Sequence, residues 1–90
     1  MPGDGGDTSR PLRLNAKVSL RDEAFGALAY HHDTRRLVFL KSRPLVELVR
    51  RLEEYGSGFE AINALVRPEE HAIYARALES LSRSEIVCGR

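Results

Sequence analysis

The chain has 90 residues, of which 42% are hydrophobic and 30% charged, and its formal net charge is +1. This length suits one domain with one small core, and the nearly neutral charge argues against a dominant role on nucleic acid or on a membrane surface. The single cysteine, Cys88, permits no intramolecular disulfide. No apolar stretch approaches the ~20 residues of a membrane span, and the N-terminus lacks the apolar segment of a signal peptide. We therefore expect a cytoplasmic protein.

The first ten residues are rich in glycine, aspartate and other small or polar residues. Such a segment cannot bury apolar surface, so residues 1–10 are expected to form a disordered tail. The folded domain is expected over residues 11–87.

Three strands are predicted at the start of this domain. Apolar and polar residues alternate from residue 12 to residue 21, as in a strand with one buried and one wet face. Residues 25–30 form a second strand, residues 31–35 a polar hairpin loop and residues 36–40 a third strand. Short connections of this kind give an antiparallel meander. The apolar face of the first strand comprises Leu12, Leu14, Ala16, Val18 and Leu20.

The third strand carries four large apolar residues in a row, with no polar alternation. Because successive side chains of a strand point to opposite faces, Leu37 and Phe39 are expected on one face, and Val38 and Leu40 on the other. Strands buried on both faces usually belong to larger, covered sheets. The second face of this strand therefore needs a cover, either from a helix of the same domain or from a partner.

Three helices are predicted after residue 41, where the hydrophobic period changes. Ser42 caps the first helix, Pro44 lies in its first turn and Gly56 ends it. Ser57 and Glu60 form a capping box for the second helix. Pro68 opens the third. The apolar positions of the three helices are Leu45, Leu48, Val49, Leu52, Phe59, Ile62, Leu65, Val66, Ile73, Tyr74, Ala77, Leu78 and Leu81.

The order of these elements predicts a small α+β, winged-helix-like domain, in which a three-stranded antiparallel sheet is followed by three helices (βββααα). The helices are expected to cover the sheet face that carries Leu14, Ala16, Val18 and Leu20. Residues 86–87 either fold back on the core or stay loose.

No catalytic set of residues is recognisable. His31 and His32 are expected to be solvated turn residues, and a zinc site would need more ligands than one cysteine and these histidines supply. His71 is either a partner contact or a plain surface residue, and Cys88 is expected to be a free, exposed thiol. No phosphate-binding loop or nucleophile elbow is present. We therefore expect neither enzymatic activity nor a cofactor.

The edge of the third strand suggests a binding role. A long apolar edge is an aggregation hazard unless it is used, and one use is to add an extended peptide to the sheet. The third helix, with small Ala72 and Ala75 beside His71, Tyr74 and Leu78, could form the other wall of such a groove. Alternatively, residues 37–40 are core residues covered by the protein's own helices. From the residues alone, both interpretations remain open.

Two further hypotheses concern other partners. A winged-helix protein could bind DNA through its third helix, but Glu69, Glu70 and Glu79 make that helix acidic before its last residue, which opposes phosphate binding. Alternatively, the chain could be a structural subunit that pairs its third strand with that of a second copy, giving a homodimer.

The segment of residues 23–52 resembles the precursor-peptide chaperones of the mycofactocin system. The motifs that carry the resemblance are FGALAY, the polar turn, RRLVFLKS and the helical LVELVRRL directly after it. The βββααα order is similar to the wider family of PqqD-like peptide-recognition domains (RiPP recognition elements), and the resemblance extends from residue 12 to about residue 81.

This resemblance implies a non-catalytic adaptor that binds a ribosomally made precursor peptide as a strand beside the third strand, against the third helix. The adaptor then presents the peptide to a radical SAM maturase, which holds the iron–sulfur cluster. Charge at Val38 or Leu78 should abolish peptide binding and leave the fold intact. Exposed cations (Arg13, Lys17, Arg21, Arg50 and Arg51) are either solvated surface or contacts for the maturase. The implied peptide-binding residues are Arg36, Leu37, Val38, Phe39, Leu40, Lys41, His71, Tyr74, Ala75 and Leu78.

Overall fold

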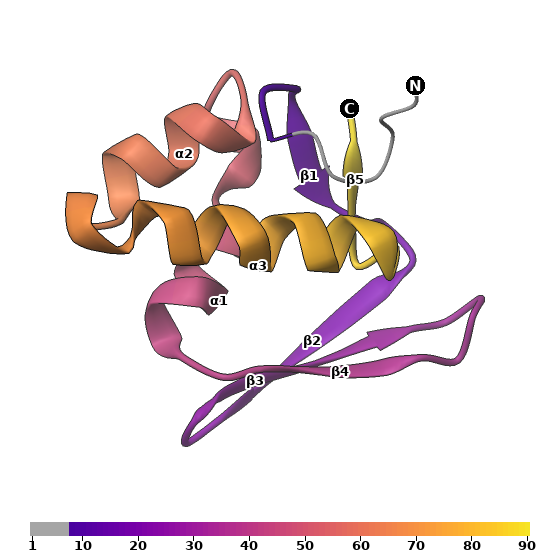
Figure 1. Ribbon diagram of the computed structural model, residues 1–90. Helices are drawn as coiled ribbons and strands as arrows, with labels where there is room; N and C mark the ends of the chain where they lie inside the picture. Colours follow the sequence, from indigo (N-terminus) through magenta and orange to yellow (C-terminus); the bar gives the residue numbers. More distant parts are fainter. Residues whose placement is uncertain (1–7) are drawn as a thin grey trace.

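Two antiparallel sheets and three α-helices make up the part of the chain that the computed structural model describes, residues 8–90. The helices lie on one side of the larger sheet (Figure 1). The strands are β1 (Leu12–Leu14), β2 (Val18–Glu23), β3 (Gly26–His31), β4 (Leu37–Leu40) and β5 (Val87–Gly89). The helices are α1 (Arg43–Arg50), α2 (Gly58–Leu65) and α3 (His71–Arg83), with short 3-10 turns η2 (Leu52–Glu54) and η3 (Pro68–Glu70).

The larger sheet has the strand order β2-β3-β4, so the predicted meander is confirmed. In its register Leu20 lies opposite Ala29, and Ala29 lies opposite Val38. Ala27 and Ala29 are fully buried, so small residues on β3 allow α1 to approach the sheet closely. The fold class is the predicted one, a small α+β, winged-helix-like domain built on a three-stranded antiparallel sheet and three helices.

The predicted first strand is wrong in its extent, because residues 12–21 form two strands in two sheets. A turn at Ala16 and Lys17 separates β1 from β2. Asn15 stabilises this turn, since its Oδ1 accepts the Lys17 N–H at 2.9 Å and its carbonyl accepts the Val18 N–H at 2.9 Å. Ala16 is exposed and does not belong to the sheet face that the helices cover.

The C-terminal segment folds back on the core. Ile86 and Val87 are fully buried, and β5 pairs with β1 so that Leu14 lies opposite Val87. The turn after α3 is a Schellman motif, in which the Ile86 N–H bonds to the Leu81 carbonyl and the Glu85 N–H to the Ser82 carbonyl. Of the two sequence alternatives for residues 86–87, the packed one is therefore confirmed.

The helix caps follow the sequence signals, whereas one helix end does not. Ser42 Oγ accepts the Leu45 N–H at 3.2 Å, and Ser57 Oγ accepts the Glu60 N–H at 3.0 Å. However, α1 ends at Arg50 rather than at Gly56, and η2 continues the chain as a tighter turn. In the predicted capping box, the Glu60 carboxylate accepts the N–H of Gly56 rather than that of Ser57.

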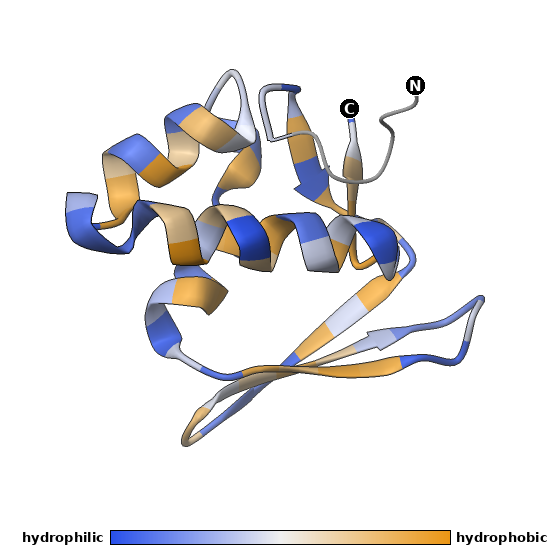
Figure 2. Ribbon diagram, viewed as in Figure 1, coloured by the Kyte–Doolittle hydropathy of each residue, from blue (hydrophilic) through white to orange (hydrophobic). Residues whose placement is uncertain are grey.

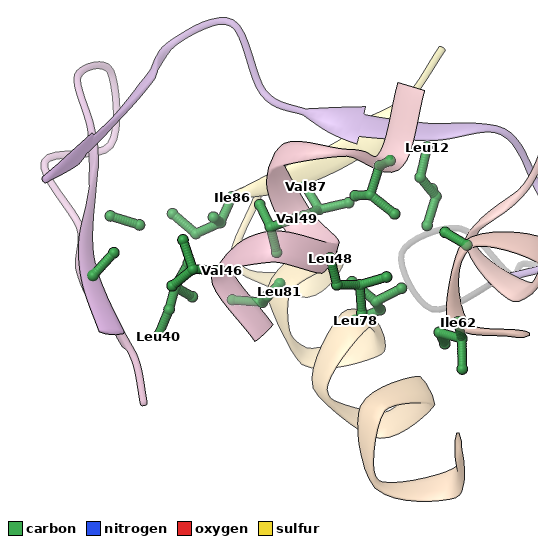
Figure 3. Close-up of a cluster of buried hydrophobic side chains, with 14 of the residues drawn as sticks. Leu12, Leu40, Val46, Leu48, Val49, Ile62, Leu78, Leu81, Ile86 and Val87 are labelled. Atoms are coloured by element: carbon green, nitrogen blue, oxygen red, sulfur yellow. The ribbon is translucent and has the colours of Figure 1, made fainter. Parts of the chain in front are cut away.

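Side chains from both sheets and all three helices meet in one core between the larger sheet and the helices (Figure 3). Its largest fully buried side chains are Leu40, Leu48, Leu52, Ile62, Leu78 and Ile86, with Val49 and Val87 beside them. Figure 2 shows β4 as one continuous hydrophobic stretch at the base of this core. Among the described residues, no helix is long and apolar enough to cross a membrane.

The predicted N-terminal tail is only partly described. The carbonyls of Thr8 and Arg10 accept the N–H groups of Phe59 and Gly58, at 2.7 and 3.1 Å. These bonds hold the chain just before β1 against the start of α2. The rest of the predicted tail, residues 1–7, lies outside the described residues.

Candidate functional site

Strand β4 has two different apolar faces. Leu40 is fully buried and Val38 is half-buried against the core, whereas Leu37 and Phe39 are 55% and 54% exposed. The expected alternation is therefore correct. The interpretation that residues 37–40 are all core is correct only for the Val38 and Leu40 face, because no described helix covers the face with Leu37 and Phe39 (Figure 1).

The outer edge of β4 is free among the described strands, because β4 is the last strand of its sheet. At the hairpin, the His31 N–H donates to the Arg36 carbonyl. Hydrogen-bonded and non-bonded pairs alternate along an antiparallel ladder, so the register places Val38 and Leu40 in bonded pairs with β3. The N–H and C=O groups of Leu37 and Phe39 consequently point away from β3, toward the free edge.

A small cavity lies where the end of β4 meets α1 and α3. Its volume is about 150 Å³. Ser42 Oγ and Tyr74 Oη lie 3.2 Å apart and tie the start of α1 to α3 at this place. Ile73 is 57% exposed, so an apolar wall of the cavity faces solvent. We call this cavity the groove, and its lining residues are Lys41, Ser42, Leu45, Ile73, Tyr74 and Ala77.

Of the residues implied by the family resemblance, Lys41 and Tyr74 line the groove. Arg36, Leu37 and Phe39 are exposed on β4 or next to it, and Val38 packs inward. Leu40 and Leu78 have no exposed surface. A charge at Leu78 would therefore lie in the core, and the expectation that the fold would tolerate it is wrong.

Two more implied residues lie beside the groove rather than in it. Ala75 packs against the core. The Nε2 atom of His71 lies 2.7 Å from the Val66 carbonyl, so this side chain binds back to the segment between α2 and η3. The groove residues absent from the implied set are Ser42, Leu45, Ile73 and Ala77, all of which the sequence assigned to helix caps or apolar helix positions.

The other titratable residues do not form a reactive centre in the described part of the chain. No group of three His, Cys, Asp or Glu side chains there could hold a metal ion. The prediction that His31 is a solvated turn residue is wrong, since it is 2% exposed and its Nδ1 accepts the N–H groups of Asp33 and Thr34, both at 3.2 Å. His32 is exposed as expected, and Cys88 is partly rather than fully exposed in β5.

Comparison with known proteins identifies the family. Residues 11–88 match the model of the Peptide chaperone MftB family. A protein named Peptide chaperone MftB from Mycobacterium ulcerans is 43% identical over 82 residues, covering 90% of this chain and 75% of that protein. Its namesake from Mycolicibacterium smegmatis is 41% identical over 76 residues, covering 83% of this chain and 74% of that protein.

The protein of the same name from Mycobacterium tuberculosis is 47% identical over a shorter segment of 49 residues, which covers 54% of this chain and 45% of that protein. No solved structure matches the chain. The family match spans nearly all of the described residues, and the relatives extend over most of the chain. The chain therefore belongs to the Peptide chaperone MftB family.

Proposed function

We propose that this chain is a non-catalytic, cytoplasmic peptide chaperone that binds a ribosomally made precursor peptide and presents it to a radical SAM maturase in mycofactocin-type biosynthesis. The family assignment supports the chaperone role. The single observation that carries the binding mode is the free edge of β4, which runs toward the groove between α1 and α3.

In this proposal the peptide adds to the sheet as a strand beside β4. The unpaired N–H and C=O groups of Leu37 and Phe39 supply main-chain hydrogen bonds, which give affinity without reading sequence. Alternate peptide side chains enter the groove, where Ile73 and Ala77 offer apolar contact and Lys41 offers a positive charge. The groove thereby supplies specificity. The peptide-contacting residues that we propose are Arg36, Leu37, Phe39, Lys41, Ser42, Leu45, Ile73, Tyr74 and Ala77.

Calorimetric titration with the synthetic precursor peptide, beside a scrambled peptide of the same composition, tests this function. We expect one-to-one binding of the true peptide alone. Absence of binding to a protein that circular dichroism shows to be folded would refute the chaperone assignment.

The same titration with duplex DNA at low salt should show no binding, because the carboxylates of η3 and α3 oppose phosphate contacts.

Two matched variants locate the binding site. Ile73 and Phe59 are 57% and 55% exposed, and each lies near the start of its helix, where an aspartate is favourable. Only Ile73 lines the groove. Ile73→Asp should weaken peptide binding at least about tenfold, because it places a charge in an apolar contact, and Phe59→Asp should leave it unchanged. Equal effects of the two changes would refute the groove assignment.

A further inference from the structure

A second apolar surface lies on the face of the β2-β3-β4 sheet opposite the helices. Along the strands, its side chains alternate with the buried ones, and the register puts Leu28 opposite Phe39 and Tyr30 opposite Leu37. Phe25 packs edge-on against Phe39, with ring centroids 5.8 Å apart. We call this surface the outer face, and its apolar residues are Phe25, Leu28, Tyr30, Leu37 and Phe39.

The outer face is hollowed and open. One cavity of about 550 Å³ is lined by Phe25, Leu28 and Phe39, with Arg21, Glu23 and Lys41 at its margins. A second, of about 340 Å³, continues past Tyr30 and Leu37. Phe25, Leu37 and Phe39 are each about half exposed, at 47%, 55% and 54%. Exposed apolar patches of contiguous residues are typical of interaction sites.

The charges around the outer face indicate what covers it. Lys41 follows β4, and Arg35 and Arg36 precede it, so cations stand at both ends of this strand. None of the three forms an ion pair with a carboxylate of the described residues. A partner with carboxylates at the edges of an apolar contact would neutralise them. A second copy of this chain would instead bring like charges together.

The other cations that the sequence offered as partner contacts behave differently. Each has a carboxylate partner within the chain: Arg13 with Glu53, Lys17 with Asp33, Arg21 with Glu23, Arg50 with Asp22, and Arg51 with Glu47 and Glu54. Their charges are already compensated. The cations at the two ends of β4 have no such partner among the described residues.

We propose that the outer face is the docking surface for the maturase, which contributes an apolar ridge flanked by carboxylates; this inference rests on the proposed function. A peptide strand beside β4 would direct every second side chain onto the outer face, next to Leu37 and Phe39. The maturase would then contact chaperone and peptide on one continuous surface. The remaining peptide side chains stay in the groove, on the other side of the sheet.

The double variant Leu28→Thr/Tyr30→Thr tests this surface, because both side chains lie on the outer face but outside the proposed peptide-contacting residues. Threonine suits a half-exposed strand, so the fold should persist, which circular dichroism checks. We expect binding to the purified maturase to weaken at least about tenfold. The affinity for the synthetic precursor peptide should change by no more than about threefold, because its main-chain bonds and groove contacts remain. Phe59→Asp, at an exposed site outside both surfaces, should leave both affinities unchanged.

Each outcome has a defined meaning. Undiminished maturase binding by the double variant, or no maturase binding by the natural sequence, would overturn the outer-face assignment. Sedimentation tests whether a second copy covers this face. If the unmodified protein is a dimer, and the double variant is a monomer that binds the maturase with unchanged affinity, the assignment is wrong. Peptide binding by the unmodified protein is measured separately, and its absence would instead refute the proposed function.

Discussion

Gly26 is the residue whose lack of a side chain the sheet most depends on. It is buried at the start of β3, and its φ angle of 156° lies in a region that L-residues with a Cβ rarely adopt. A Cβ at this position would also collide with the carbonyl oxygen of Leu40. The close approach of Gly26 to the end of β4 determines where that strand meets Ser42, the cap of α1. The geometry of the groove therefore depends on this glycine.

Gly26→Ala should lower the free energy of unfolding by at least about 2 kcal/mol, because backbone strain and overpacking act together. Chemical denaturation monitored by circular dichroism measures this change. Gly56→Ala is the matched control, since a Cβ there would meet only the flexible carboxylate of Glu60. The control should shift the free energy by less than about 1 kcal/mol. Equal stability of the two variants would contradict the close-approach argument.

At the scale of one element, α3 combines a strained end with two differently placed apolar rows. Glu85 follows its C-cap with a φ of 66°, the left-handed conformation that a Schellman motif requires and that glycine usually adopts. The adjacent Ile86 and Leu81 are both buried and complete the motif. Along the helix, Leu78 and Leu81 face the core, whereas Ile73 and Ala77 face the groove.

Glu85→Gly should stabilise the protein by roughly 0.5–1 kcal/mol, because glycine removes the left-handed penalty and this outweighs its greater freedom in the unfolded chain. Thermal unfolding checks this prediction. Glu85→Ala removes the same carboxylate but keeps a Cβ, so it should give no gain. A gain of the same size from alanine would show that the carboxylate, rather than the backbone, was the source of the effect.

At the scale of the whole molecule, the chain presents two surfaces along one strand. The groove lies between α1 and α3 just beyond the end of β4, the outer side of β4 belongs to the apolar outer face, and the edge of β4 is free among the described strands. The charge of Arg51 is compensated within the chain, since hydrogen bonds to Glu54 and Glu47 raise the pKa of its guanidinium. Arg35, Arg36 and Lys41 at the ends of β4, in contrast, have no ion-pair partner among the described residues.

Local patterns predicted much of this arrangement. The LVFL run predicts the two apolar faces of β4. The change of hydrophobic period at Ser42 predicts the start of α1. The alternation of apolar and polar residues does not reveal the break between β1 and β2, because it continues across the turn at Ala16 and Lys17. The pairing of β1 with β5 joins opposite ends of the chain, which periodicity cannot reveal.

The groove residues were harder to predict for a related reason. An amphipathic pattern marks every apolar position of α3 but does not distinguish a row that meets the core from a row that lines an open groove. The pattern therefore does not separate Leu78, which lies in the core, from Ile73 and Ala77, which line the groove. The polar residues after His31 are typical of a loop, although His31 is the last residue of β3. There its ring accepts hydrogen bonds from the N–H groups of Asp33 and Thr34.

Strand addition to β4 is most directly tested by amide hydrogen exchange of the protein with and without the synthetic precursor peptide. The N–H groups of Leu37 and Phe39 point to the free edge, so the peptide should slow their exchange strongly. The N–H groups of Val38 and Leu40 already bond within the sheet and should change much less. If the peptide binds and protects α3 but leaves the exchange of Leu37 and Phe39 unchanged, then the peptide does not add to the sheet as a strand beside β4.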